Sequence, residues 1–284
     1  MRLLEAFEFV ARQRPQWKAG GHTYAPPFSF NRQHCLRLLG PDKDVRKITR
    51  QDLAVMRNTL LTERVSKEGK TRSPGGVNRI MSMLNTLLRD LAECDVIDKA
   101  PKLKALREDN TRTEYFTREE IDRLLEAATG VFNNDELAAA ITFGVFTGCR
   151  QGEMLKLTVA DVDLQEGLIF FPETKNGTTH IIDIHPALKP VLEPRVRGCR
   201  RDAKVFRFDN KDHLWREFQK VRSYCGISKD KVWHTLRHTT GTWLAEKGVP
   251  LQTIARVLNH KQTSTSERYI KLTDKARQSA IHSL

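Results

Sequence analysis

Helical spacing of apolar residues runs through most of this sequence, and one short section breaks it. The clearest helical stretch follows Ser73-Pro74, where apolar residues recur every three or four positions: Ile80, Leu84, Leu87, Leu88 and Leu91. The exception is a pair of strand-like runs, 168–171 and 181–184, on either side of Lys175-Asn176-Gly177. Asn-Gly between two such runs is a strong hairpin signal. The pattern therefore predicts a mainly α-helical protein with one small antiparallel sheet.

Two domains are predicted from the distribution of these patterns. The 284 residues are enough for about two domains, each able to bury a core. Helical spacing fills residues 1–97, and the stretch 98–115 combines a proline and many charges with few apolar residues, as is typical of a linker. The second domain, 116–284, opens on a capping box, because Thr117 stands three residues before Glu120.

The chain is strongly basic, with a formal net charge of +13, and its basic residues are spread along the whole sequence. A folded basic protein is expected to bind nucleic acid, because each neutralised phosphate releases counterions and adds affinity. One charged run, 63–72, is typical of a solvent-exposed loop. In a DNA-binding bundle the same run could follow the phosphate backbone.

Other features bear on where the protein acts. The longest apolar stretch, around 137–146, is too short to cross a bilayer, and the N-terminus lacks the apolar core of a signal peptide. The five cysteines are far apart and form no CxxC pair, which is typical of reduced thiols and predicts no structural zinc site. We expect a cytoplasmic protein, associated with the nucleoid when bound to DNA, with no cofactor and no membrane partner.

Residues able to act on a phosphodiester are spread over the second domain: Arg150 and Glu153 in Thr-Gly-Cys-Arg-Gln-Gly-Glu, His234 and Arg237 in His-Thr-Leu-Arg-His, then His260 and Tyr269. Arginines can fork onto phosphate oxygens, histidines can donate hydrogen bonds as charge builds, and a tyrosine can act as the nucleophile. Taken singly, each motif has a plainer interpretation. Arg150 and Glu153 could form a structural ion pair, and Tyr269 could be a packing residue. His234 and His238 could bind a metal, but the glutamate of H-E-x-x-H is missing.

The order of these residues resembles that of the tyrosine recombinase (phage-type integrase) family. An arginine is followed by a hairpin lysine, then by His-x-x-Arg, and finally by a histidine nine positions before a tyrosine. The resemblance covers about 117–270 with specific motifs and is weaker over the first domain, where it rests on the helical pattern. It implies a helical core-binding domain and an α+β catalytic domain that close around duplex DNA like a clamp.

Carried onto this chain, the resemblance assigns roles to the cationic residues. Arg150 and Arg237 would clamp the scissile phosphate. His234 and His260 would stabilise the transition state and help to manage the proton of the nucleophile. Glu153, one helical turn from Arg150, would support that arginine and would not itself react. Cations fixed in this way can neutralise phosphate charge in place of magnesium, so no metal is implied.

The resemblance also assigns the nucleophile and the acid. Tyr269 would attack phosphorus to form a 3′-phosphotyrosyl bond, and Lys175, at the hairpin tip, would protonate the 5′-oxygen that leaves. Lys189 and Lys204 also lie near the strand-like runs and are alternatives for the acid. The family usually has glycine before the late histidine, and here the residue is Asn259. Asparagine is the next-best residue for a left-handed helix cap, so we expect the fold to tolerate it.

The resemblance implies site-specific strand exchange that integrates or excises a mobile element. The active form would be a homotetramer on double-stranded DNA, with accessory DNA-bending or directionality proteins as further partners. Three alternatives stay open: a type IB topoisomerase with a similar active site, a non-catalytic DNA-binding protein, and a metal nuclease. The last would need clustered carboxylates, which the sequence does not show.

Overall fold

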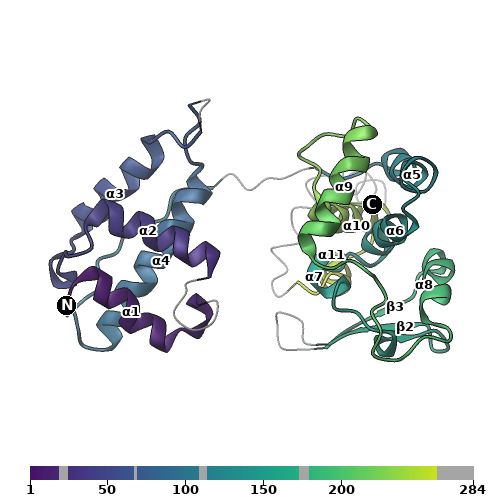
Figure 1. Cartoon of the computed structure of the whole chain (residues 1–284), viewed down its shortest axis with the longest axis horizontal. Coiled ribbons are helices and arrows are strands. Elements are labelled where there is room, and N and C mark those ends of the chain that lie inside the picture. Colours follow the sequence, from purple (N-terminus) through teal and green to yellow (C-terminus); the bar gives the residue numbers. More distant parts are fainter. Residues whose placement is uncertain (19–24, 67–68, 109–113, 173–178, 261–284) are drawn as a thin grey trace, which may run out of the picture. The chain divides into compact units, whose positions relative to one another are not determined.

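The computed structural model describes five stretches of the chain: 1–18, 25–66, 69–108, 114–172 and 179–260. The chain folds as two compact units, Met1–Asn110 and Thr111–Leu284 (Figure 1). Both are mainly helical, and within the described stretches the strands belong to the second unit. The predicted class, mainly α with a small antiparallel sheet, is confirmed.

The first unit is a helical bundle arranged around its longest described helix. Its helices are α1 (Leu3–Gln13), α2 (Pro26–Leu39), α3 (Arg50–Thr62) and α4 (Pro74–Glu93), with 3-10 turns at Pro15–Trp17 and Val45–Lys47. Helix α4 contacts each of the other three. Its apolar stripe is buried in these contacts, and Leu84, Leu87 and Leu88 are 0% exposed. Burying each such leucine stabilises the bundle by about 1.5–3 kcal/mol.

Side-chain caps fix where α3 and α4 begin. The Thr49 hydroxyl accepts a hydrogen bond from the Asp52 N–H at 3.2 Å, and the Asp52 carboxylate accepts one from the Thr49 N–H at 2.8 Å. Ser73 likewise accepts from the Gly76 N–H at 3.2 Å. Pro74 occupies the first helical position, where its missing N–H would have had no partner within the helix. The helices predicted near Thr49 and after Ser73 are confirmed.

The chain beyond α4 stays in contact with the bundle for several residues. Asn78 of α4 pairs twice with the backbone of Leu106: its amide donates to the carbonyl at 2.9 Å and accepts from the N–H at 3.0 Å. Leu103 and Leu106 pack against the core of the first unit. Residues 103 and 106 lie inside the stretch predicted as a linker, and they are held to the helical bundle.

The second unit surrounds a buried helix. Its helices are α5 (Arg118–Glu126), α6 (Asp135–Thr147), α7 (Gln151–Met154), α8 (Lys189–Val196), α9 (Lys211–Tyr224), α10 (Trp233–Glu246) and α11 (Leu251–Val257), with a π turn at Ala127–Val131 and 3-10 turns at Val159–Asp161 and Pro186–Leu188. Helix α6 contacts α5, α8, α9 and α10. Because neighbours cover it on several sides, α6 is apolar over most of its circumference and shows no clear polar face. The buried helix predicted at 137–146 is confirmed.

A three-stranded antiparallel sheet completes the second unit. It contains β1 (Val162–Asp163), β2 (Leu168–Phe171) and β3 (His180–Asp183), in that order. Ile169 pairs with Ile182, which confirms the predicted hairpin. Ile169 and Phe171 are buried while their neighbours in β2 are partly exposed, as one-sided burial of a strand requires. Strand β1 is not predicted from sequence, because two residues cannot display a period of two. Asn176-Gly177 lies outside the described residues.

Candidate active site

The first predicted arginine stands at the start of α7, just after the end of α6. Arg150 donates from its side chain to the Glu153 carboxylate at 2.6 Å, and the same carboxylate accepts from the Arg150 N–H at 2.8 Å. Glu153 is 12% exposed and Arg150 is 31% exposed. A carboxylate held at a helix start by a backbone N–H has little freedom to move, so it orients the guanidinium.

Gly148 makes the connection between α6 and Arg150 possible. It ends α6 in the left-handed region, with φ 61°. A Cβ at this position would lie within 3.0 Å of Leu258 Cδ2, closer than real Cβ atoms come, and 3.1 Å from the Thr240 hydroxyl. The glycine therefore allows both a left-handed turn and close packing between the end of α6 and the end of α11.

The second predicted arginine is almost completely buried. Arg237, in α10, is 4% exposed. Its Nη1 donates to the Gly148 carbonyl at 2.7 Å, and its Nη2 donates to the Leu258 carbonyl. Burying a guanidinium is costly unless acceptors replace water, and two carbonyls supply that replacement here.

The residue that departs from the family pattern forms a left-handed helix cap. Asn259 has φ 48°. The Asn259 N–H donates to the Arg256 carbonyl at 3.0 Å, and the His260 N–H donates to the Ala255 carbonyl at 2.9 Å. This pair of bonds is a Schellman motif, which normally places glycine in the left-handed position. The tolerance expected for asparagine is confirmed. The Asn259 carbonyl also accepts a hydrogen bond from Arg150 Nη2 at 3.2 Å.

The two predicted histidines come from different segments of the second unit. His260 directly follows the left-handed residue and is partly exposed. His234 is exposed on α10, one turn before Arg237, and its ring lies edge-to-face with that of His238 at 4.9 Å between centroids. The structure thus brings together Arg150, Arg237 and His260 through the turn at 258–260. Lys175 and Tyr269 lie outside the described residues.

Two hollows open beside these residues. One, of about 490 Å³, is lined by Arg150, Glu153, Lys156 and Lys211 together with part of β2. The other, of about 680 Å³, is lined by Asn259 and His260 and by β3. His180 lines the second hollow, and its Nε2 lies 3.1 Å from the carbonyl oxygen of Arg256. Burial lowers the pKa of His180, which favours its neutral form.

Sequence reasoning did not find Lys211. This exposed lysine begins α9, far along the chain from Arg150, yet it lines the same hollow. A Cβ added to Gly152 would lie 3.4 Å from Lys211 Cε and Nζ, so the end of the lysine side chain lies next to the Arg150 motif. Of the alternatives for the acid, Lys204 donates to the Lys156 carbonyl at 2.7 Å, and Lys189 begins α8.

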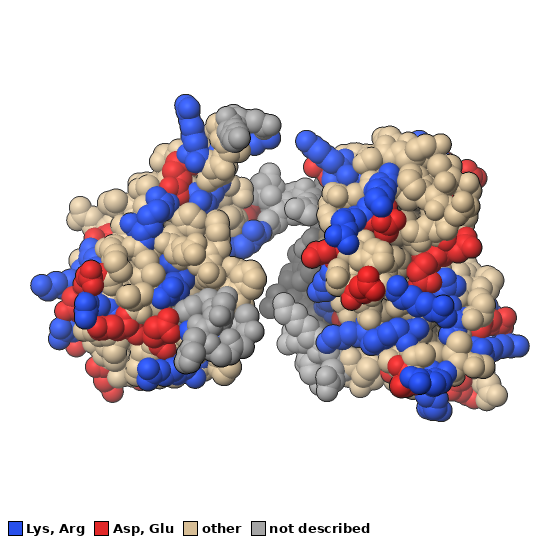
Figure 2. All heavy atoms as spheres, in the orientation of Figure 1, with Lys and Arg blue, Asp and Glu red and all other residues tan. Residues whose placement is uncertain are grey.

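Charged side chains also cover the first unit. Figure 2 shows Lys and Arg spread over the visible face of each unit, with Asp and Glu among them. The two ends of the charged run 63–72 lie side by side, because Arg64 and Thr71 form an antiparallel bridge and the Val65 N–H donates to the Lys70 carbonyl at 2.8 Å.

No helix in the described stretches is long and apolar enough to cross a membrane.

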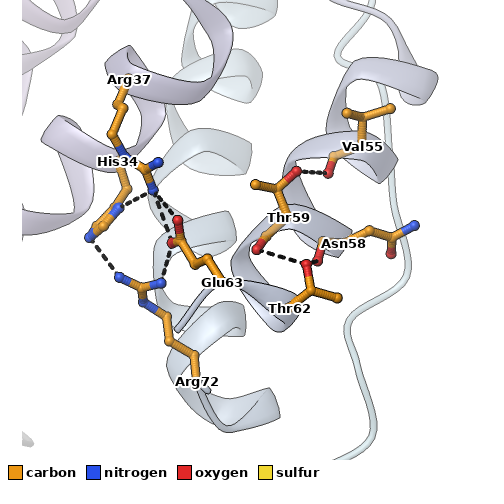
Figure 3. A network of polar contacts seen from close by, with 8 residues as sticks. All are labelled: His34, Arg37, Val55, Asn58, Thr59, Thr62, Glu63 and Arg72. Atoms are coloured by element: carbon orange, nitrogen blue, oxygen red, sulfur yellow. Dashed lines mark hydrogen bonds and ion pairs between the residues drawn. The ribbon is translucent and has the colours of Figure 1, made fainter. Parts of the chain in front are cut away.

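One carboxylate holds two arginines at the base of this run. Glu63 accepts from Arg37 at 2.6 Å and from Arg72, and the His34 ring faces both guanidinium groups at 3.2 and 3.1 Å (Figure 3). Burial, followed by the charges of Arg72 and Arg37, lowers the pKa of His34. A neutral imidazole can accept from an arginine where a charged one would be repelled.

Comparisons with known proteins agree with this architecture. The model of the phage integrase family matches residues 114–276. The tyrosine recombinase XerA of Saccharolobus solfataricus is 27% identical and covers 81% of this chain and 77% of its own length. A tyrosine recombinase of Pseudothermotoga lettingae is 26% identical, covering 78% of this chain and 79% of its own.

Solved structures of integrases share the fold over nearly the whole chain. The Tn1549 transposon integrase in complex with circular intermediate DNA aligns with a TM-score of 0.73 at 15% identity and covers 99% of each chain. A lambda integrase dimer bound to a core site aligns with a TM-score of 0.71 at 19% identity, covering 98% of this chain and 97% of that one. The family match spans more than half of the sequence. This chain therefore belongs to the phage integrase family and is a tyrosine-type site-specific DNA recombinase.

Proposed function

We propose that this recombinase breaks and rejoins DNA through a 3′-phosphotyrosyl intermediate on Tyr269, and that it integrates or excises a mobile element. The Tyr269 oxygen attacks phosphorus as the bond to the 5′-oxygen breaks. Lys175 supplies the proton that the departing oxygen takes up. Since the phosphotyrosyl bond keeps the energy of the broken bond, a second DNA end can attack it and rejoin the strand without ATP.

The described side chains have the chemistry that this reaction needs. Arg150 and Arg237 neutralise the charge that the transition state places on the non-bridging oxygens. His234 and His260 donate hydrogen bonds to the same group and manage the proton of the nucleophile. Glu153 holds the guanidinium of Arg150 at 2.6 Å and takes no part in proton transfer.

One observation carries this proposal. Arg237 and Arg150 donate hydrogen bonds to the carbonyls of two adjacent residues, Leu258 and Asn259. The next residue is His260, which the resemblance assigns to the same site. Three of the residues expected to contact the scissile phosphate are therefore anchored at one turn. The family match, 114–276, includes both Lys175 and Tyr269.

Assembly on DNA is part of the same proposal. The first unit would serve as the core-binding domain and the second unit as the catalytic domain. The net charge of +13 on the whole chain favours binding to duplex phosphates. Strand exchange between two duplexes cuts four strands and so uses four tyrosine nucleophiles, one from each protomer. The active species would therefore be a tetramer, and DNA-bending or directionality proteins would assist it. Sedimentation of the protein with two crossover-site duplexes should give four protomers per complex. A stable complex of two protomers that completes exchange would contradict this stoichiometry.

Replacing the nucleophile tests the reaction itself. With a nicked suicide substrate, the wild type should form a covalent protein–DNA adduct without magnesium, and Tyr269→Phe should bind the site but form no adduct. Tyr224→Phe is the matched control, because Tyr224 is a 62% exposed phenol in the same unit. An adduct formed by Tyr269→Phe would overturn the assignment. Relaxation of supercoiled DNA lacking a specific site would instead favour a topoisomerase.

A further inference from the structure

The two arginines of the site are held by backbone groups and not only by side chains. Arg237 donates to the carbonyl of Leu258, and Arg150 donates to the carbonyl of Asn259 at 3.2 Å. A guanidinium carries five N–H donors, so it can bind such a carbonyl and also a phosphate. The two carbonyls belong to successive peptide units that are joined at the Cα of Asn259, so the separation of the two guanidinium groups depends on the backbone angles of this one residue.

We propose that Asn259 is a positioning residue, whose left-handed conformation sets the placement of Arg150 relative to Arg237. This inference rests on the proposed function, in which Arg150 and Arg237 bind the scissile phosphate. Asn259 acts through its backbone: its own carbonyl anchors Arg150, and the carbonyl just before it anchors Arg237.

The conformation of Asn259 determines where its own carbonyl lies relative to the carbonyl of Leu258. At φ 48° the chain reverses direction after α11, and the Schellman bonds to the Arg256 and Ala255 carbonyls close the turn. Rotation to a right-handed φ would break the bond from the His260 N–H and move the Asn259 carbonyl away from Arg150. Glycine and asparagine tolerate the left-handed region, whereas a β-branched residue is strongly disfavoured there.

The turn is also fixed from the other side. Leu258 is 0% exposed, and its side chain fills the space left by the missing Cβ of Gly148. The Gly148 carbonyl accepts from Arg237 Nη1 at 2.7 Å. Arg237 is therefore bound to both partners of this packing contact, at the end of α6 and at the end of α11. A shift of the turn would be passed to Arg237 as well as to Arg150.

The consequence for catalysis can be separated from a general loss of stability. Misplacing a catalytic group by about 1 Å costs about 100-fold in rate. That cost should fall on the charged phosphate, because the arginines act on its negative oxygens. A methylphosphonate at the scissile position lacks one of those negative charges, so its cleavage should depend less on the arginine pair.

The experiment compares Asn259→Val and Asn259→Gly in the full-length protein on these two suicide substrates. Asn259→Val should cleave the phosphate substrate about 100-fold more slowly than wild type, with half-site binding unchanged, and its defect on the methylphosphonate should be under about tenfold. Asn259→Gly, which keeps the left-handed turn, should restore cleavage of the phosphate substrate.

A second asparagine supplies the control. Asn133 has φ 46° and lies in the same unit, before α6, so Asn133→Val introduces the same backbone strain away from the arginines. It should leave the ratio of the two cleavage rates at the wild-type value. Equal defects of Asn259→Val on both substrates, or a matching ratio in Asn133→Val, would overturn the positioning role. Absence of an adduct in the wild type would instead refute the proposed function.

Discussion

Replacing Gly148 by alanine should destabilise the second unit by about 2 to 5 kcal/mol. An L-residue held at φ 61° costs about 1–2 kcal/mol relative to glycine. The added methyl would also overlap Leu258, and overpacking of this kind costs about 1–3 kcal/mol. Leu258 cannot swing away cheaply, because it is 0% exposed and enclosed by its neighbours.

Gly226→Ala separates the two costs. Gly226 has φ 64°, with nothing within 4 Å of an added Cβ, so only the backbone cost of about 1–2 kcal/mol should remain. Urea unfolding followed by tryptophan fluorescence reports mainly on this unit, which contains three of the four tryptophans: Trp215, Trp233 and Trp243. Equal losses in the two variants would show that Leu258 moves aside and that α6 and α11 are not tightly packed at this point.

Four further predictions concern the charged residues. Arg150→Lys and Arg237→Lys should each lose about 100-fold or more in cleavage rate on a suicide substrate, because lysine cannot bind phosphate with two prongs; near-normal rates would demote that arginine to a structural role. Lys175→Ala should slow cleavage of normal DNA far more than cleavage of a substrate with a 5′-thiolate leaving group, which departs without a proton; equal defects would exclude Lys175 as the acid. Since the pKa of His34 is lowered in the folded chain, protons bind the unfolded chain more readily, and stability should fall as pH drops below about 6.5. Urea midpoints at pH values above and below that point should show this fall, and His34→Gln should lack this part of it. Lys211→Ala should weaken binding to the crossover site and reduce the slope of log affinity against log salt by about one; an unchanged slope would place Lys211 away from phosphates.

Local rules explain why so much of the fold could be predicted. The capping box at Thr117 and Glu120 needs only three residues of spacing, and the structure has both bonds, at 3.2 and 2.9 Å. The left-handed cap at Asn259 could be expected because asparagine enters the left-handed region more readily than other residues that have a side chain. The order of the arginine and histidine motifs points to one family because that combination is rare, although each motif alone is ambiguous.

Features that depend on distant pairs could not be predicted. Asn78 pairs with the backbone of Leu106 across 28 positions, and a polar residue in a helix gives no sign of such a partner. Lys211 lines the Arg150 hollow although it lies about 60 positions further along the chain, and the Arg150 motif gives no sign of such a partner. Arg237 is anchored by main-chain carbonyls. Every residue type has a main-chain carbonyl, so the sequence does not mark the residues that supply these anchors.

Anchoring by main-chain carbonyls has a consequence for how members of this family are found by sequence pattern. A contact made by a carbonyl places no direct selection on the side chain of the residue that supplies it. The anchor itself needs only a residue at position 259 whose backbone can enter the left-handed region, and both Gly and Asn meet that need. Searches that demand glycine before the late histidine will overlook chains of this kind, whereas a pattern that accepts either residue at that position will retain them.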